Sequence, residues 1–156
     1  MGIFLKTEKV KKEWTDYNGH MNVAYYTQIY DTSSEIFLKK FKMDESASKI
    51  EKRTTFSVEA YTIYNQEVKF GDEIDVKLLF LDRDKKRLLY KLAIFNRKEK
   101  YLSSTSEILN LYVDLKSRKV AEFEDGKKKI MDDYIRNNSS KFDTEKLILI
   151  NKLKKI

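Results

Sequence analysis

The 156-residue chain contains no cysteine, no proline, one histidine and four glycines. Without cysteine it has no disulfide scaffold, no thiolate nucleophile and no cysteine-based zinc site. The single histidine, His20, excludes a histidine-rich metal cluster. The scarcity of glycine excludes a glycine-rich phosphate loop and a G-x-S-x-G nucleophile elbow. Several classes of enzyme and of metal-binding domain are therefore ruled out.

Long apolar runs are also missing, because none approaches the roughly 18 residues that cross a bilayer. The first ten residues, MGIFLKTEKV, lack the apolar core of a signal peptide. We therefore expect no integral membrane segment and a cytoplasmic protein. The net charge is +7, but the lysines are spread along the chain and interleaved with acids. This pattern favours a solvated surface over a nucleic-acid interface, so we expect no nucleic-acid partner.

Apolar residues make up 41% of the chain and aromatic residues 13%, which is typical of a globular domain. Asn22 is a good helix N-cap. After it, side chains that can face a core recur at spacings of three and four, which predicts a helix of about five turns over 23–41. These residues are Val23, Tyr26, Tyr30, Ser33, Phe37 and Phe41.

A period of two replaces the helical spacing in much of the remaining chain, which indicates β-strands. A polar connection over 42–52 separates the predicted helix from these strands. The predicted strands span 3–14, 54–69, 73–82, 87–96 and 101–115, with a short edge strand over 118–123. A long helix before an antiparallel meander must bury its apolar stripe on that sheet. The sequence therefore predicts an α+β layered fold, in which a curved antiparallel sheet wraps one helix.

Residues 124–156 differ from the preceding domain, which we assign to 1–123. A short helix is predicted over 127–138, followed by a basic amphipathic helix over 144–156. The second helix would gather Leu147, Ile150 and Leu153 on one side. We expect it to pack on the domain or on a second subunit. A helix that binds a membrane surface or a partner is the alternative.

The densest group of chemically active residues is the loop over 15–22, where Asp16, Asn18 and His20 alternate. The loop leads into the N-terminus of the predicted helix, where free backbone N–H groups can stabilise an oxyanion. A carboxylate beside such donors suits hydrolysis of a carbonyl substrate. The alternatives are that Asp16 and Asn18 only form turn hydrogen bonds and that His20 is structural.

The stretch V-K-K-E-W-T-D-Y-N-G-H-M-N-V-A-Y-Y, residues 10–26, resembles the hotdog-fold acyl-CoA thioesterases of the 4-hydroxybenzoyl-CoA thioesterase-like superfamily. The similarity is greatest to thioesterase units associated with carnitine and betaine catabolism, which carry a similar E-W-x-D-Y-N-G-H-M segment. Ser57-Val58-Glu59, Asn65-Gln66-Glu67-Val68 and Gly71-Asp72 match the second strand of that family and its turn. The resemblance covers roughly residues 8–123.

The resemblance implies a hotdog fold and hydrolysis of an acyl-CoA to free acid and CoA, with no metal or organic cofactor. It implies a catalytic set of Asp16, Asn18, His20 and Glu67. Water would be activated by a carboxylate, and the carbonyl would be polarised at the helix N-terminus. We favour Glu67 as the base and Asp16 as the orienting or nucleophilic acid. Glu59 is the alternative base, because without a bulge it faces the same side of the strand as Glu67.

The substrate-binding candidates are Trp14, Tyr17, Gly19, Met21, Asn22, Tyr25 and Tyr64. Hotdog sites commonly lie between subunits, so the resemblance also implies a homodimer or a homotetramer. A hotdog hydratase or dehydratase is the first alternative function, although its D-x-N-P-x-H motif is longer and contains proline. A non-catalytic acyl-CoA-binding module is the second alternative.

Overall fold

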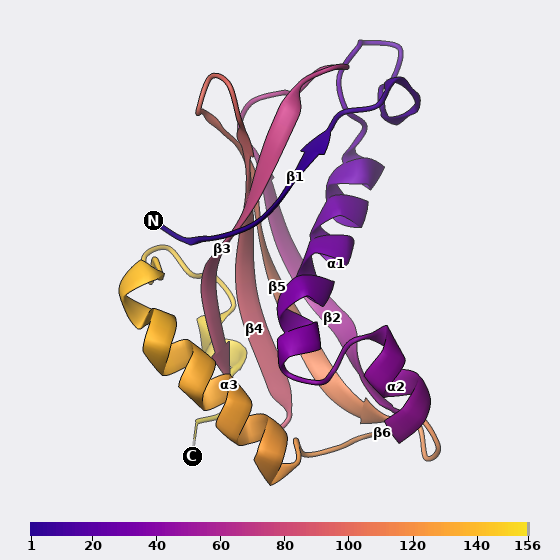
Figure 1. Ribbon diagram of the computed structural model, residues 1–156, viewed down its shortest axis with the longest axis vertical. Coiled ribbons are helices and arrows are strands. Elements are labelled where there is room, and N and C mark those ends of the chain that lie inside the picture. The colour runs from indigo at the N-terminus through magenta and orange to yellow at the C-terminus, as the bar shows by residue number, and fades with distance from the viewer. Residues whose placement is uncertain (156) are drawn as a thin grey trace.

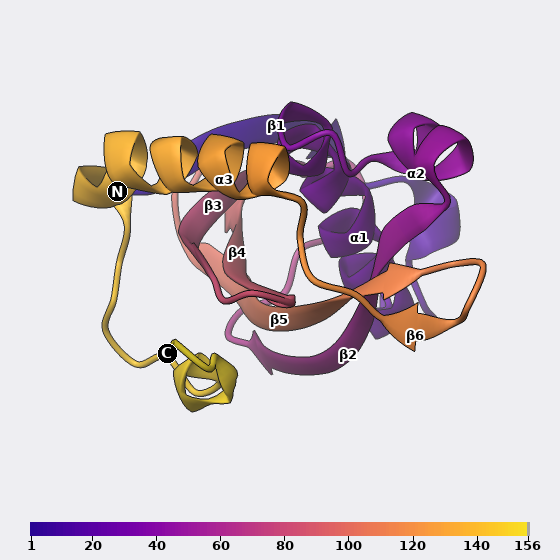
Figure 2. The ribbon, with the colours of Figure 1, turned by 90° about the horizontal axis from the view of Figure 1, so that it is seen from below.

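The computed structural model describes residues 1–155, in which a curved antiparallel sheet of six strands wraps around one long helix (Figures 1 and 2). The strands are β1 Ile3–Lys9, β2 Arg53–Tyr64, β3 Glu73–Arg83, β4 Arg87–Asn96, β5 Leu102–Asp114 and β6 Lys119–Val120. The helices are α1 Val23–Lys40, α2 Glu45–Glu51 and α3 Asp125–Asn138, with 3-10 turns at Lys12–Trp14, Ser139–Lys141 and Ile150–Lys152. The strand order β1-β3-β4-β5-β2, with β6 paired to β5, leaves β1 and β2 as edges. This arrangement confirms the predicted α+β fold.

Helix α1 begins where the sequence predicts, because the side chain of Asn22 accepts a hydrogen bond from the Ala24 N–H at 2.9 Å. Its apolar face is buried on the inner face of the sheet, where Phe37 packs edge-on against Tyr90. In β3 to β5, alternate residues point to this inner core or to the opposite, outer face of the sheet. The long helix therefore serves as the central core element, and its N-terminus lies at one end of the sheet (Figure 1).

Three predicted strands are too long. β1 ends at Lys9 instead of residue 14, because alternation stops in the polar run before the 3-10 turn at Lys12–Trp14. β2 ends at Tyr64 instead of residue 69, and the chain then leaves the sheet. The predicted edge strand over 118–123 is reduced to β6, whose two residues pair with Val113 and Asp114. Shortening β2 matters most, because it moves Glu67 from a strand into a loop.

The predicted polar connection over 42–52 contains helix α2, which the sequence analysis missed. Asp44 caps this helix by accepting a hydrogen bond from the Ala47 N–H at 3.4 Å, and Lys49 pairs with Glu45 one turn earlier. The helix has no apolar stripe to reveal it. It ends at Glu51, and the next residue, Lys52, caps it with a φ of 60° in the left-handed region.

The C-terminal residues pack on the sheet in two ways. Helix α3 confirms the predicted helix over 127–138, and it inserts Met131 and Tyr134 into the core beside α1. The predicted helix over 144–156 is wrong, because this part of the chain contains only the 3-10 turn Ile150–Lys152. Its last residue, Ile156, lies outside the described residues. The tail runs along the outer face of the sheet, opposite α1 (Figure 2).

Two buried carboxylates hold this tail. Glu107 of β5 accepts hydrogen bonds from the backbone N–H groups of Ile148 and Leu149 at 2.8 and 2.9 Å. Asp84 accepts one from the Lys154 N–H at 2.8 Å. In an α-helix, these backbone N–H groups would donate to the carbonyls of residues four positions earlier. Here they donate to side-chain carboxylates, so the tail does not form a helix. Its apolar side chains cover a second small core of Phe80, Leu89 and Leu109. No helix among the described residues is long and apolar enough to span a membrane.

Candidate functional site

The loop over 15–22 is a tight turn and not an extended segment. Thr15 and Met21 form an isolated bridge, and the Asp16 N–H donates to the His20 carbonyl at 2.9 Å. Gly19 closes the turn with a φ of +79°, and its N–H donates to the Asp16 carbonyl at 3.0 Å. A side chain at that φ would be strained, so the turn depends on glycine here. The alternating residues Asp16, Asn18 and His20 therefore lie on a turn, and the extended loop that would direct their side chains to one region is absent.

Asp16 and Asn18 form the local turn that the sequence left as an alternative. The Asp16 carboxylate accepts a hydrogen bond from the Asn18 N–H at 2.8 Å. Asn18 lies exposed at the tip of the loop. His20 lies on the returning strand of the turn, next to the start of α1. Of the three residues, His20 alone reaches another segment of the chain.

His20 and Glu67 meet across two loops that are distant in sequence. His20 Nε2 contacts Glu67 Oε2, and Lys69 Nζ lies 3.5 Å from Glu67 Oε1. Backbone pairing of His20 with Lys69, and a hydrogen bond from the Met21 N–H to the Val68 carbonyl at 3.0 Å, hold the loops together. The side chains of His20 and Glu67 remain 44% and 38% exposed, so a ligand can reach both. The resulting carboxylate–imidazole pair lies at the N-terminus of α1.

Hydroxyl groups beneath Glu67 fix its loop, and the sequence analysis did not single them out for this role. The Tyr101 hydroxyl donates to the Glu67 carbonyl at 2.5 Å, and the Ser103 hydroxyl donates to the Gln66 carbonyl at 2.6 Å. The Tyr26 hydroxyl lies 3.1 Å from Ser103 Oγ. Burial raises the pKa of Tyr26, and the nearby Glu67 charge adds to this effect. The local sequence gives no signal of these contacts, because they depend on the path of the chain after β2 ends at Tyr64.

The predicted substrate-binding residues fall into different environments. Trp14 and Tyr25 stack with ring centroids 5.7 Å apart, and Tyr64 packs edge-on against Tyr26 at 5.2 Å. Tyr17 is 97% exposed at the loop tip. Met21 is buried in the core. Asn22 caps α1 with its side chain. Trp14, Tyr25 and Tyr64 therefore remain the better placed candidates.

Glu59, the alternative base, lies apart from this site. Glu59 lies within β2, but the strand ends at Tyr64, before Glu67 is reached, so the strand alternation does not relate the two residues. The Glu59 carboxylate lies 3.6 Å from Lys152 Nζ, in the tail on the outer face. Glu59 and Glu67 therefore do not face the same side, contrary to the expectation for an unbroken strand.

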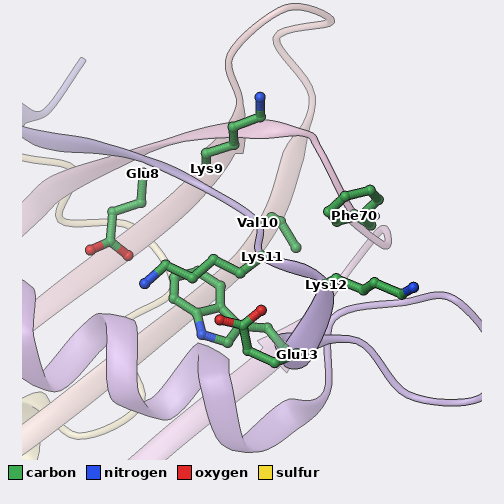
Figure 3. A pocket seen from close by; sticks show the side chains of 8 residues that line it. Glu8, Lys9, Val10, Lys11, Lys12, Glu13 and Phe70 are labelled. Atoms are coloured by element: carbon green, nitrogen blue, oxygen red, sulfur yellow. The ribbon is translucent and has the colours of Figure 1, made fainter.

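A groove of about 540 Å³ runs along the segment from Glu8 to Trp14 and is closed at one side by Phe70 (Figure 3). Lys9, Lys11 and Lys12 lie along it, and Lys11 Nζ is 5.2 Å from the centre of the Trp14 ring. His20 and Glu67 are not among its lining residues. Among residues 1–155, no three His, Cys, Asp or Glu side chains lie close enough together to hold a metal ion.

The family model described as "Thioesterase-like superfamily" matches residues 10–131. A betainyl-CoA thioesterase of Pseudomonas aeruginosa is 28% identical over 115 residues, which cover 74% of this chain and 72% of that protein. An L-carnitine dehydrogenase/betainyl-CoA thioesterase of Rhizobium meliloti is 30% identical over 111 residues, 71% of this chain. Those residues cover only 22% of that longer protein. Both relatives agree with the resemblance seen in residues 10–26.

Solved structures share the fold. A hypothetical protein of Staphylococcus aureus in complex with CoA superposes with a TM-score of 0.80 at 24% identity, covering 100% of this chain and 96% of that chain. A 1,4-dihydroxy-2-naphthoyl-CoA thioesterase of Synechocystis has a TM-score of 0.74 at 17% identity, covering 83% and 96%. These similarities confirm the predicted hotdog fold.

Proposed function

The chain belongs to the thioesterase-like superfamily and is an acyl-CoA thioester hydrolase, and we propose that Glu67 is its general base. The contact between His20 and Glu67 carries this proposal. It joins a partly exposed carboxylate to the loop that leads into α1. A base beside a cluster of backbone donors is the arrangement that hydrolysis of a carbonyl compound requires.

In the proposed reaction, a water molecule bound to Glu67 attacks the thioester carbonyl carbon and transfers one proton to the carboxylate. The carbonyl oxygen becomes an oxyanion, which the positive N-terminus of α1 stabilises. The C–S bond then breaks, and Glu67 returns the proton to the leaving CoA sulfur. His20 and Lys69 orient Glu67 through their contacts with its two oxygens.

Asp16 and Asn18 have supporting roles in this proposal. The hydrogen bond between the Asp16 carboxylate and the Asn18 N–H shapes the turn that presents His20. The sequence predicted Asp16 as either an orienting or a nucleophilic acid, and the proposal gives it the orienting role. Asn18 holds the turn through its N–H group. Trp14, Tyr25 and Tyr64 are proposed to contact the substrate.

The experiment is release of free CoA from a panel of acyl-CoA esters by wild-type protein, Glu67→Gln and Glu59→Gln. We expect Glu67→Gln to lower kcat/KM by about 10³-fold, because general bases contribute roughly 10²–10⁴. Glu59→Gln is the matched control, because it removes the alternative carboxylate, which lies in β2 beside Lys152, and it should keep wild-type kcat. An equal loss of kcat/KM in Glu67→Gln and Glu59→Gln would contradict the assignment of Glu67 as the general base. No turnover on any ester by folded wild-type protein would contradict the function.

We also propose that the enzyme is a homodimer joined through β2. This strand is an edge of the sheet, and unpaired edges tend to be covered. Five large apolar side chains of β2 are between 41% and 50% exposed: Phe56, Val58, Tyr61, Ile63 and Tyr64. A homotetramer of two such dimers is the alternative assembly. A cytoplasmic location is part of the same proposal, since CoA thioesters are metabolites of the cell interior.

Light scattering tests the dimer with one substitution at each sheet edge. Ile63→Lys, on β2, should shift the protein to monomer at micromolar concentration. Phe4→Lys, on the opposite edge β1, replaces a side chain that is 55% exposed and should leave the dimer intact. A monomeric wild-type protein, or the same shift in both variants, would refute the β2 interface.

A further inference from the structure

The loop over 65–68 carries Glu67 beyond the end of β2, where the pairing of the sheet no longer fixes the chain. Side-chain hydroxyls at the start of β5 hold the loop instead. The Ser103 hydroxyl donates to the Gln66 carbonyl at 2.6 Å, and the Tyr101 hydroxyl donates to the Glu67 carbonyl at 2.5 Å. Of these two contacts, the one from Tyr101 acts on the backbone of the proposed base itself.

Asn96, the last residue of β4, sets the direction of the Tyr101 hydrogen bond. The Glu99 N–H donates to Asn96 Oδ1 at 2.9 Å, so the oxygen of this amide faces Glu99. Asn96 Nδ2 then lies 3.3 Å from the Tyr101 oxygen, and an amide nitrogen can only donate. Because the Tyr101 oxygen accepts from Asn96, its single proton is directed to the Glu67 carbonyl. Asn96 is 4% exposed, which shields its amide from water.

The backbone position of Glu67 determines what its carboxylate can reach. One carboxylate oxygen contacts His20 Nε2, and the other lies 3.5 Å from Lys69 Nζ. Both partners have side chains that are at least 44% exposed, so these contacts alone hold Glu67 loosely. Displacing a catalytic group by about 1 Å can cost on the order of 10² in rate. A hydrogen bond that fixes the Glu67 backbone can therefore change turnover.

We propose that Tyr101, oriented by Asn96, is a positioning residue for Glu67. This inference rests on the proposed function, in which Glu67 is the general base. Tyr101 acts through the Glu67 backbone and does not touch the substrate. Its hydroxyl therefore contributes to the chemical step and not to substrate binding, so its removal lowers kcat and leaves KM unchanged.

The first test compares kcat, KM and Tm of Tyr101→Phe with those of Tyr112→Phe on the best acyl-CoA ester. Tyr112 is the matched control, because its hydroxyl donates to Glu124 at 3.1 Å near the other end of β5. Each variant loses one hydrogen bond, so each should lower Tm by about 2–4 °C. We expect only Tyr101→Phe to lower kcat, by about tenfold, with KM within about twofold of wild type. Equal kcat in the two variants, or a change in KM alone, would overturn the inference.

The second test uses Asn96→Asp, which keeps the shape of the side chain and the acceptor for the Glu99 N–H. A carboxylate has no proton to donate, so it competes with the Glu67 carbonyl for the Tyr101 proton. We expect Asn96→Asp to lower kcat in the wild-type background. In Tyr101→Phe it should have no further effect, because no hydroxyl proton remains to be diverted. Wild-type kcat in Asn96→Asp, or additive losses in the double variant, would overturn the role of Asn96.

Glu67→Gln separates the failure of this inference from the failure of the proposed base. If Glu67→Gln loses turnover and Tyr101→Phe does not, the positioning role of Tyr101 is wrong and the base assignment stands. If Glu67→Gln keeps wild-type turnover, both are wrong.

Discussion

On the outer face of the sheet, the buried carboxylate of Glu107 accepts hydrogen bonds from two backbone N–H groups of the tail. At the N-terminus of α1, the Glu67 carboxylate contacts His20 and Lys69 but remains 38% exposed. Buried polar groups in folded proteins are normally paired, as Glu107 is, whereas an exposed carboxylate can reach a ligand. Glu107 fixes the chain, and Glu67 stays accessible. This difference separates a structural carboxylate from the one that we assign to catalysis.

The largest effect expected on the outer face follows from Glu107→Ala. This change leaves the buried Leu149 N–H and the Ile148 N–H without their acceptor, so we expect the free energy of unfolding to fall by about 3 kcal/mol. Turnover by the remaining folded protein should stay within about twofold of wild type, because Glu107 lies across the sheet from the site. Urea denaturation and kcat measured on the same preparation check both statements.

Glu107→Gln keeps one acceptor oxygen and should recover part of the lost stability. A loss of kcat in Glu107→Gln, with stability preserved, would show that the two faces are not functionally separate.

Asp84 gives a smaller, pH-dependent effect. Burial raises its pKa, but hydrogen bonds from the Lys154, Lys86 and Arg87 backbones and from the Arg87 side chain outweigh burial and lower the pKa below its usual 3.8. A carboxyl with a lowered folded-state pKa adds stability that is complete above its unfolded value. That stability is lost as the pH falls through the folded-state pKa.

We therefore expect wild-type protein to exceed Asp84→Asn in unfolding free energy at pH 7, and the difference to shrink below about pH 4. Asp82→Asn is the control, because Asp82 lies two residues earlier, near the end of β3, and pairs with Lys155 near the surface. A constant difference between wild type and Asp84→Asn from pH 7 to pH 3 would contradict this account.

The smallest effect is expected for Lys152→Ala, which removes the ion pair with Glu59 on the outer face. The two side chains are 55% and 42% exposed and 3.6 Å apart. Exposed pairs of this kind contribute at most about 1 kcal/mol. Thermal denaturation of Lys152→Ala should therefore resemble that of wild-type protein. A loss as large as that of Glu107→Ala would show that exposed charge, not buried hydrogen bonding, holds the tail.

Sequence periodicity was sufficient for the elements that form the main core. The stripe from Tyr26 to Phe37 and the alternation in β3 to β5 are local patterns, and each leads to the observed element. The tail was predicted incorrectly because Glu107, which lies 41 residues before Ile148, takes the N–H groups that a helix would use. Helix α2 was missed because its evidence is one cap residue, Asp44, without an apolar stripe. The division of the chain at residue 123 stays a prediction.

The candidate site was predictable only in part. The motif around His20 is a local pattern, and Glu67 followed from the resemblance rather than from spacing. Their contact depends on the end of β2 at Tyr64, which the alternation did not reveal.

The central claim, that Glu67 activates water, is tested most directly by a single turnover in ¹⁸O-labelled water with enzyme in excess over acyl-CoA. The account predicts that the released acid carries one ¹⁸O atom and that peptide mass spectrometry finds no label in Glu67. Unlabelled acid in the first turnover, with ¹⁸O in the Glu67 carboxylate, would contradict it, because the carboxylate would then have attacked the thioester itself.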